Sequence, residues 1–241
     1  MEPSEEFDRP ENPYLTPESS LHEPAFRPAE TPEELNPFKT VWIRPRETVR
    51  WLTATNPELH VVLLACIAGI GSSLDRASLR NVGDTTPVPV IVTIACLVGP
   101  LGGLITLWAG SHLIRLSGSW IGGVGNRVHI KTAMAWALVP AIAALPLWIP
   151  QLALFGSEMF TAKTPRLDAS PWLWIPFLGI GLVEIVLGVW NIVLLCKMVA
   201  EVQGFRSAWR GLANVVLAAA IILVPLVVLV IIVAMAIGLS T

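Results

Sequence analysis

Five long apolar stretches occupy the chain from residue 59 to the C-terminus. They cover residues 59–74, 88–114, 132–157, 172–196 and 211–239. The second and the fifth contain no Asp, Glu, Lys or Arg, and each exceeds the roughly 20 apolar residues that cross a ~30 Å hydrocarbon core. A soluble protein has no core that could hide uncharged helices of this length. The pattern therefore predicts an all-α fold, a polytopic membrane bundle of five transmembrane helices within residues 58–241.

Two of these stretches contain residues that shape helices. Small residues recur at helical spacing in the second, which lets a neighbouring helix approach closely. Prolines interrupt the third and predict a kinked or broken helix, whose freed carbonyls need partners from neighbouring helices or side chains. These residues are Gly99, Gly103, Thr106 and Gly110 in the second stretch and Pro140, Pro146 and Pro150 in the third.

Residues 38–57 carry a different pattern. Trp42, Pro45, Val49 and Leu52 form an apolar stripe at helical spacing, and basic side chains lie between them. The basic residues are Arg44, Arg46 and Arg50. The pattern predicts an amphipathic helix in the cytoplasmic membrane interface, where the arginines and Trp42 would meet anionic lipid headgroups or a partner. The same stripe would equally allow the helix to pack on the protein's own cytoplasmic face.

The first 37 residues are acidic and rich in proline. Residues 1–36 carry ten acidic and two basic side chains, a net charge of −8, while the whole chain has −2. With so little apolar surface to bury, this segment cannot offset the entropy of ordering, and we expect it to be disordered. It would serve either as an interaction tail or as a solubilising leader.

The composition and the motifs narrow the chemistry. Hydrophobic residues make up 54% of the chain and charged residues 14%, against about 25% charged in an ordinary soluble domain. The three cysteines lie inside apolar stretches and have neither a disulfide nor a metal-ligand spacing. No zinc-protease or phosphate-loop motif is present. We therefore expect a non-enzymatic protein with no cofactor, metal ion or nucleic-acid partner, whose main partner is the lipid bilayer.

The Lys and Arg residues of the connecting segments predict the orientation. Ten lie in residues 38–57 and in the loops after the second and the fourth stretches, and four lie in the other two loops. Loops rich in Lys and Arg stay in the cytoplasm. The N-terminus is therefore predicted to be cytoplasmic, and five spans place the C-terminus outside.

Glu184 is the residue that most needs an explanation, because it lies near the centre of the fourth stretch. A charged group at that depth costs several kcal/mol, about 2.5–3.5 on insertion scales. Lys197 is too far away to pair with it, about 20 Å along a helix. We therefore expect Glu184 to be protonated or hydrogen-bonded, and Thr93 or Thr106 of the second stretch could supply the partner.

Two interpretations of this position stay open. Asn191 lies on the same helical face as Glu184, together with two glycines that would let a neighbouring helix come close. Functionally, Glu184 and Asn191 would form an intramembrane polar site for proton coupling or substrate binding. Structurally, Glu184 would make an interhelical hydrogen bond that fixes packing.

Several short motifs lie, in order, at residues 36–38, 42–48, 74–78, 120–125, 135–140 and 200–209. Taken together they resemble bacterial members of the Yip family, relatives of the Ypt/Rab-interacting membrane proteins of eukaryotes. The resemblance implies five transmembrane helices and a cytosolic N-terminus, and eukaryotic members are linked to Rab GTPase binding and membrane shaping. The Asp-Leu-x-Gly-Pro signature of those members is only echoed at residues 97–101, without its aspartate, which argues against Rab binding.

Two functions follow as hypotheses. The first is a non-enzymatic scaffold in a bacterial cytoplasmic membrane that recruits or organises protein partners on its cytoplasmic face. The alternative is a small transporter or channel-like protein with a mid-membrane site around Glu184, beside the proline-interrupted third span. Five spans cannot form two equal halves within one chain, so a transporter of this kind would favour a homo-oligomer.

Overall fold

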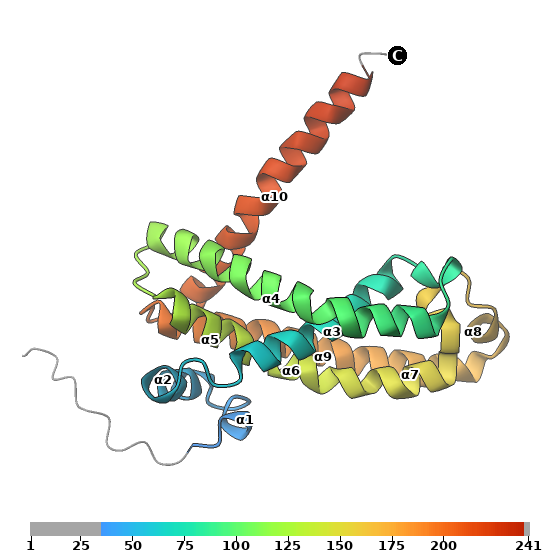
Figure 1. The fold of residues 1–241 in the computed structure, drawn as a ribbon, viewed down its shortest axis with the longest axis horizontal. Helices are drawn as coiled ribbons and strands as arrows, with labels where there is room; N and C mark the ends of the chain where they lie inside the picture. Colours follow the sequence, from blue (N-terminus) through green and yellow to red (C-terminus); the bar gives the residue numbers. More distant parts are fainter. Residues whose placement is uncertain (1–34, 239–241) are drawn as a thin grey trace, which may run out of the picture. The chain divides into compact units, whose positions relative to one another are not determined.

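The computed structural model describes residues 35–238, which are helical and contain no strand within that range (Figure 1). The predicted disorder of the acidic tail concerns residues that lie, up to residue 34, outside the described part. The α-helices are α1 (Pro37–Thr40), α2 (Pro45–Thr55), α3 (Val61–Leu79), α4 (Val88–Trp120), α5 (Arg127–Ala137), α6 (Val139–Ala144), α7 (Trp148–Phe155), α8 (Pro165–Ala169), α9 (Trp174–Val202) and α10 (Ala208–Gly238). Four short 3-10 helices connect them: η1 (Val82–Asp84), η2 (Leu145–Leu147), η3 (Gly156–Phe160) and η4 (Pro171–Leu173).

Five helical segments are long and apolar enough to cross a membrane, which confirms the predicted five spans. They are Val61–Leu79, Val88–Trp120, Arg127–Phe160, Pro171–Val202 and Ala208–Val233. All five extend beyond the predicted apolar stretches at one end or both, because the helical structure continues into residues that hydropathy assigns to loops. The extension of α3 to residue 79 matters below, because it places Asp75 inside a helix.

The third span is broken, as its prolines predict. It consists of α5, α6, η2 and α7 in succession. Pro140 lies in the first turn of α6 and Pro146 lies in η2, where a missing N–H interrupts no complete helical ladder. The span therefore changes helix type twice between Leu138 and Trp148.

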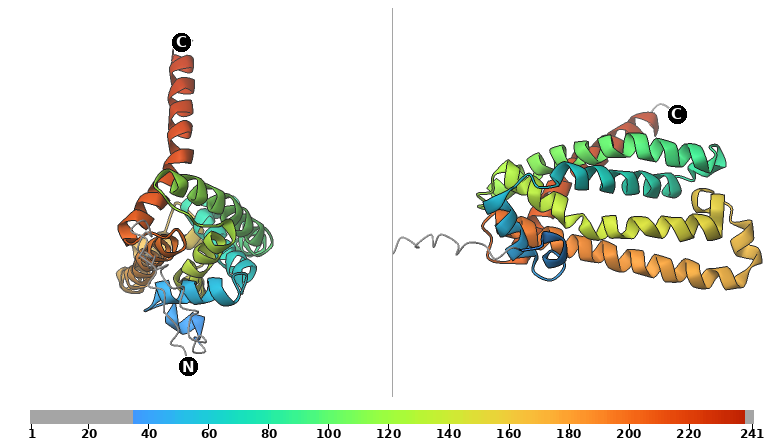
Figure 2. Two further views of the ribbon diagram at one scale, coloured as in Figure 1. Left: turned by 90° about the vertical axis from the view of Figure 1, so that its left-hand side faces the viewer. Right: turned by 60° about the horizontal axis from the view of Figure 1, so that its bottom comes forward.

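The closest helix contact joins α3 and α4, which run side by side (Figure 2). A Cβ atom at Gly69 would overlap the carbonyl oxygen of Gly99, and a Cβ atom at Gly103 would overlap that of Ala65. The two backbones therefore touch, and only glycine fits at the crossing. This confirms the predicted close approach at the small-residue stripe of the second span, whose Gly110 faces a methionine of α5 instead.

The first half of α10 packs against α4 and α9. A Cβ atom at Gly211 would overlap the carbonyl oxygen of Cys196 on α9. Ser117 of α4 and Asn214 of α10 are both fully buried, and Ser117 Oγ lies 2.6 Å from Asn214 Oδ1. Beyond this contact α10 leaves the other helices (Figure 1), and its large apolar side chains from residue 222 to residue 233 are exposed.

Replacing Gly103 by alanine should destabilise the bundle, because the added methyl group meets the backbone of α3. Overpacking of this kind costs about 1–3 kcal/mol. The matched control is Gly102→Ala, since a Cβ atom there meets nothing within 4 Å and alanine is the better helix former. Thermal unfolding in lipid nanodiscs should give a lower midpoint for Gly103→Ala alone. Equal midpoints for the two variants would contradict the close contact.

Candidate functional site

Helix α2 packs on the bundle, against α5 and α9. Val49 and Leu52 are completely buried in a cluster that includes Trp136 of α5 and Met198 of α9. Burying two such side chains contributes roughly 3–6 kcal/mol by area. Of the two alternatives for this helix, packing on the protein's own surface is the one observed, so its apolar stripe is not available to lipid.

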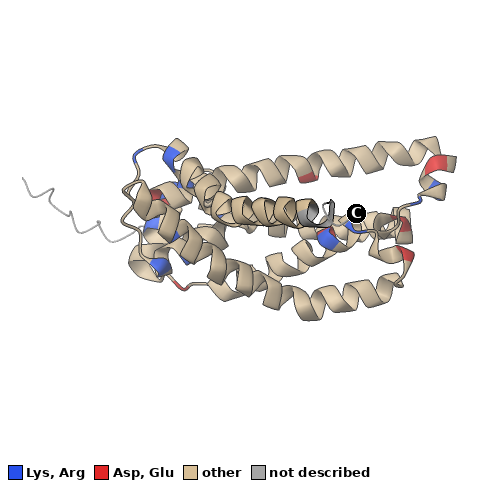
Figure 3. Ribbon diagram, turned by 90° about the horizontal axis from the view of Figure 1, so that it is seen from above, with Lys and Arg blue, Asp and Glu red and all other residues tan. Residues whose placement is uncertain are grey.

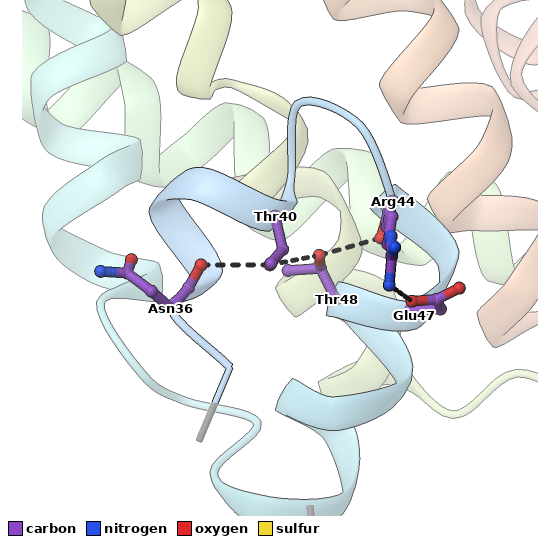
Figure 4. A network of polar contacts seen from close by, with 5 residues as sticks. All are labelled: Asn36, Thr40, Arg44, Glu47 and Thr48. Atoms are coloured by element: carbon purple, nitrogen blue, oxygen red, sulfur yellow. Dashed lines mark hydrogen bonds and ion pairs between the residues drawn. The ribbon is translucent and has the colours of Figure 1, made fainter. Parts of the chain in front are cut away.

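A turn at residues 41–43 separates α1 from α2, so the helix predicted over residues 38–57 is two helices. Figure 4 shows the polar contacts that hold this turn. The hydroxyl oxygen of Thr48 lies 2.9 Å from both the Thr40 hydroxyl and the Arg44 carbonyl oxygen, and Thr40 donates to the Asn36 carbonyl oxygen at 3.1 Å. Trp42 lies in the turn and not on the stripe of α2.

Two of the three predicted arginines hold α2 in place. Arg50 donates through Nε and Nη2 to Glu201 Oε1 of α9, at 3.0 and 2.6 Å. Arg46 donates to the carbonyl oxygen of Arg206 at 3.2 Å. Arg44 forms only an exposed pair at 3.5 Å with an acidic residue of α2 itself, and exposed pairs contribute about 0–1 kcal/mol. Arg44 is therefore the one of the three whose side chain does not tie this segment to another described helix or loop.

A groove of about 300 Å³ lies beside α2. Its charged lining residues are three basic ones, Arg44, Arg46 and Lys197, and one acidic one, Glu47, which pairs with Arg44. Ile43, whose side chain is 81% exposed, also lines it. Figure 3 shows that Lys and Arg gather at this end of the bundle, while Asp and Glu are more frequent at the end that carries α8. The groove therefore combines positive charge with an exposed apolar side chain.

Gln203 joins the loop of residues 121–126 to the end of α9. Its side chain is buried, its Nε2 donates to the carbonyl oxygen of Ile114 at 3.0 Å, and its Oε1 accepts from the Gly125 N–H at 2.9 Å. A Cβ atom at Gly118 or Gly123 would overlap this amide. The glycines thus make room for a side chain of a distant segment, and the loop is packed on the bundle.

Glu184 forms an interhelical hydrogen bond with the third span. Gln151 of α7 donates through Nε2 to Glu184 Oε1 at 2.7 Å. The expectation that Thr93 or Thr106 would be the partner is wrong, since each hydroxyl donates to a carbonyl oxygen of its own helix at 2.8 Å. The proline-interrupted span supplies the partner instead, and Gln151 follows directly after one of its prolines.

The same carboxylate lies at the junction of two cavities between the helices. One, of about 490 Å³, is lined by side chains of α3, α6, α7 and α9, and the other, of about 370 Å³, lies between α7 and α9. Gly181, Glu184 and Ile185 line both. We refer to the two cavities together as the polar cleft.

Asp75 is the functional candidate that the sequence pattern does not reveal. It lines the larger cavity together with Glu184 and lies close to Trp148. The apolar stretch ends at residue 74, which leaves Asp75 in a loop, whereas α3 continues to Leu79 and carries the carboxylate inside the helix. A second carboxylate therefore faces the one at position 184.

Asn191 lies about 10 Å beyond Glu184 along α9, seven residues at 1.5 Å each. It lines neither cavity of the polar cleft, and its buried Oδ1 has no hydrogen-bond partner among the described residues. The structure therefore joins Glu184 to Asp75 and Gln151, and it does not join Glu184 to Asn191.

Comparison with known families supports one assignment. A model of the Yip1 domain matches residues 39–236, which covers α2 to α10 and all five spans. A comparison with curated proteins gives no match, and neither does one with solved structures.

Replacing Gln203 by leucine should release the loop of residues 121–126, because the Gly125 N–H and the Ile114 carbonyl oxygen would lose their partner. Unsatisfied buried groups cost about 1–3 kcal/mol each. Hydrogen exchange read by mass spectrometry should show faster exchange in that loop. The matched control is Gln151→Leu, the same change in a buried glutamine of α7, which should leave the loop unchanged. Slow exchange in both variants would show that Gln203 does not hold the loop.

Proposed function

The chain belongs to the Yip1 domain family, and from this premise we propose that it is a non-enzymatic membrane scaffold that recruits protein partners. The recruiting surface is the α2 end of the bundle, which we place on the cytoplasmic side of a bacterial membrane. The excess of Lys and Arg at that end supports this orientation. The acidic segment before α1 would then also be cytoplasmic.

The groove beside α2 is the observation that carries this proposal. Helix α2 is held by a buried apolar stripe and by the Arg50–Glu201 pair, so the groove is formed before any partner arrives. A preformed surface binds without the cost of ordering its own side chains and loops. Its charge, from Arg44, Arg46 and Lys197, suits an acidic segment of a partner, and Ile43 offers an apolar anchor.

Removing two of these charges should weaken recruitment without unfolding the bundle. The variant is Arg44→Gln with Lys197→Gln, which spares the pair that holds α2. Proximity labelling from a ligase fused to the N-terminus, in native membranes, should recover fewer of the proteins labelled by the wild type. Because the ligase labels the compartment that contains it, recovery of cytosolic proteins would also support the orientation.

The control for this experiment is Arg80→Gln with Arg166→Gln, which removes the same charge near the α8 end. Its labelled proteins should match those of the wild type. Identical labelling by all three chains would reject the groove as the recruiting surface. Loss of anionic-lipid binding with unchanged labelling would assign the groove to the bilayer.

A transporter or channel-like function is the second candidate, and the polar cleft is the observation that favours it. Broken helices line the mid-membrane sites of many transporters, and an ionisable side chain inside a membrane span often marks such a site. Glu184, Gln151 and the interrupted third span provide these features. The carboxylate could carry a proton or contact a substrate.

If this second function holds, Glu184→Gln should abolish proton flux. Proteoliposomes with an entrapped pH-sensitive dye would report the decay of an imposed pH gradient, compared with protein-free vesicles. The control is Asp168→Asn, which changes an exposed carboxylate of α8 and should keep the wild-type rate. Equal decay for the wild type and Glu184→Gln would rule out proton coupling through this residue.

A further inference from the structure

The polar cleft holds two acidic side chains and no basic one. Asp75 of α3 and Glu184 of α9 line its larger cavity, whose other lining residues are uncharged. Arg76 follows Asp75 in the chain but lines a different cavity, together with Arg80. Within residues 35–233 neither carboxylate forms a salt bridge. Two like charges at a site of low dielectric require a compensating positive charge or a proton.

Gln151 provides a second, independent observation on this cleft. Its side chain is only 4% exposed and lines the smaller cavity, where its Nε2 donates to Glu184. Its Oε1 is buried and accepts no hydrogen bond from the described residues. Buried amide oxygens are almost always hydrogen-bonded. The amide that holds Glu184 is therefore incompletely satisfied at the wall of the cleft.

The walls of the cleft indicate what kind of molecule fits. Glycines and small apolar side chains predominate, and the indole of Trp148 is the one aromatic wall of the larger cavity. A volume of about 490 Å³ falls within the range of small-molecule pockets, which are mostly apolar with a few placed polar groups. A bare metal ion would leave most of this space unfilled.

We propose that the polar cleft binds a small organic ammonium ion, whose charged nitrogen lies between Asp75 and Glu184. Gln151, which lines the smaller cavity and donates to Glu184, would hold that carboxylate toward the ion, and the apolar body would lie along the glycine-lined face of α9. The amine could be a soluble molecule or the ammonium headgroup of a lipid, since both present the same chemistry. This inference is independent of the scaffold function, and it would supply the ligand for the transport alternative.

The test is thermal unfolding of the full chain in nanodiscs of phosphatidylglycerol, a lipid without an amine. Benzylamine is the probe, and benzyl alcohol, a neutral molecule of nearly the same shape, is its control. At ten times its Kd, benzylamine should raise the unfolding midpoint by on the order of 3–6 °C. Benzyl alcohol should not. An equal shift with both molecules, or none with benzylamine, would overturn the proposal.

Carboxylate variants locate the effect. Asp75→Asn and Glu184→Gln should each lose the benzylamine shift, whereas Asp168→Asn, outside the cleft, should retain it. Persistence of the shift in both cleft variants would overturn the proposal. Since the readout is binding, loss of uptake or of partner recruitment in other experiments would leave the result unaffected.

Glycine variants keep the test decisive if a carboxylate variant does not fold. A Cβ atom at Gly188 meets nothing within 4 Å, and Gly188 lines the larger cavity, so Gly188→Leu should fill the cleft without a clash. Gly179→Leu is the matched control, since it is equally free of neighbours but lines neither cavity. Benzylamine should stabilise Gly179→Leu and not Gly188→Leu. Equal stabilisation of both would overturn the proposal.

A second set of nanodiscs distinguishes the two sources of the amine. Phosphatidylethanolamine replaces half of the phosphatidylglycerol and offers its ammonium headgroup at high local concentration. Loss of the benzylamine shift would support the site with a lipid headgroup as the occupant. A retained shift would support it with a soluble amine. A shift that Glu184→Gln retains in these nanodiscs would contradict both.

Discussion

The hydrocarbon core offers no hydrogen bonds, and the rest of this structure depends on that constraint. Each polar group inside the bundle needs a partner from the protein itself. Ser117 of α4 meets Asn214 of α10, Gln203 satisfies groups of two other segments, and Gln151 meets Glu184. Each of these contacts joins elements that are distant in the sequence. The buried polar side chains therefore fix which helices are neighbours, a task that apolar packing against lipid cannot perform alone.

The two ends of the bundle differ in how completely their buried polar side chains are hydrogen-bonded. At the α2 end, both Nε2 and Oε1 of the buried Gln203 amide are hydrogen-bonded, and α2 packs on the bundle through its apolar stripe. That end is therefore rigid, and its free charges point outward. Toward the α8 end, the third span is broken and Gln151 has one satisfied and one unsatisfied atom. Rigid polar surfaces suit recognition of proteins, whereas incomplete polar pairs inside a bilayer suit small ligands.

Much of the architecture could be predicted from sequence, because span number, the proline breaks and the glycine stripe of α4 follow from local composition. The hydrogen-bond partners of the buried polar side chains could not be predicted, since they depend on how the helices are arranged. Nothing in the sequence near Glu184 indicates Gln151, which lies 33 residues away on a broken helix. Asp75 was missed for a different reason. Hydropathy ends the first span before it, whereas a helix can continue past its last apolar residue where a carboxylate faces a cleft.

The space around Glu184 bears on whether that residue is structural or functional. A carboxylate that served only to fix packing would need its partner, Gln151, and close contact of the helices on either side. The structure has the partner but not the close contact. Added side chains at Gly181 and Gly188 would meet open space, unlike those at Gly69 and Gly103, where helices touch. Glycine in a helix interior costs up to about 1 kcal/mol, which close packing offsets at the α3–α4 crossing. On α9 no such contact offsets the cost at Gly181 and Gly188, and both line the larger cavity beside the carboxylate, which favours a binding role for Glu184.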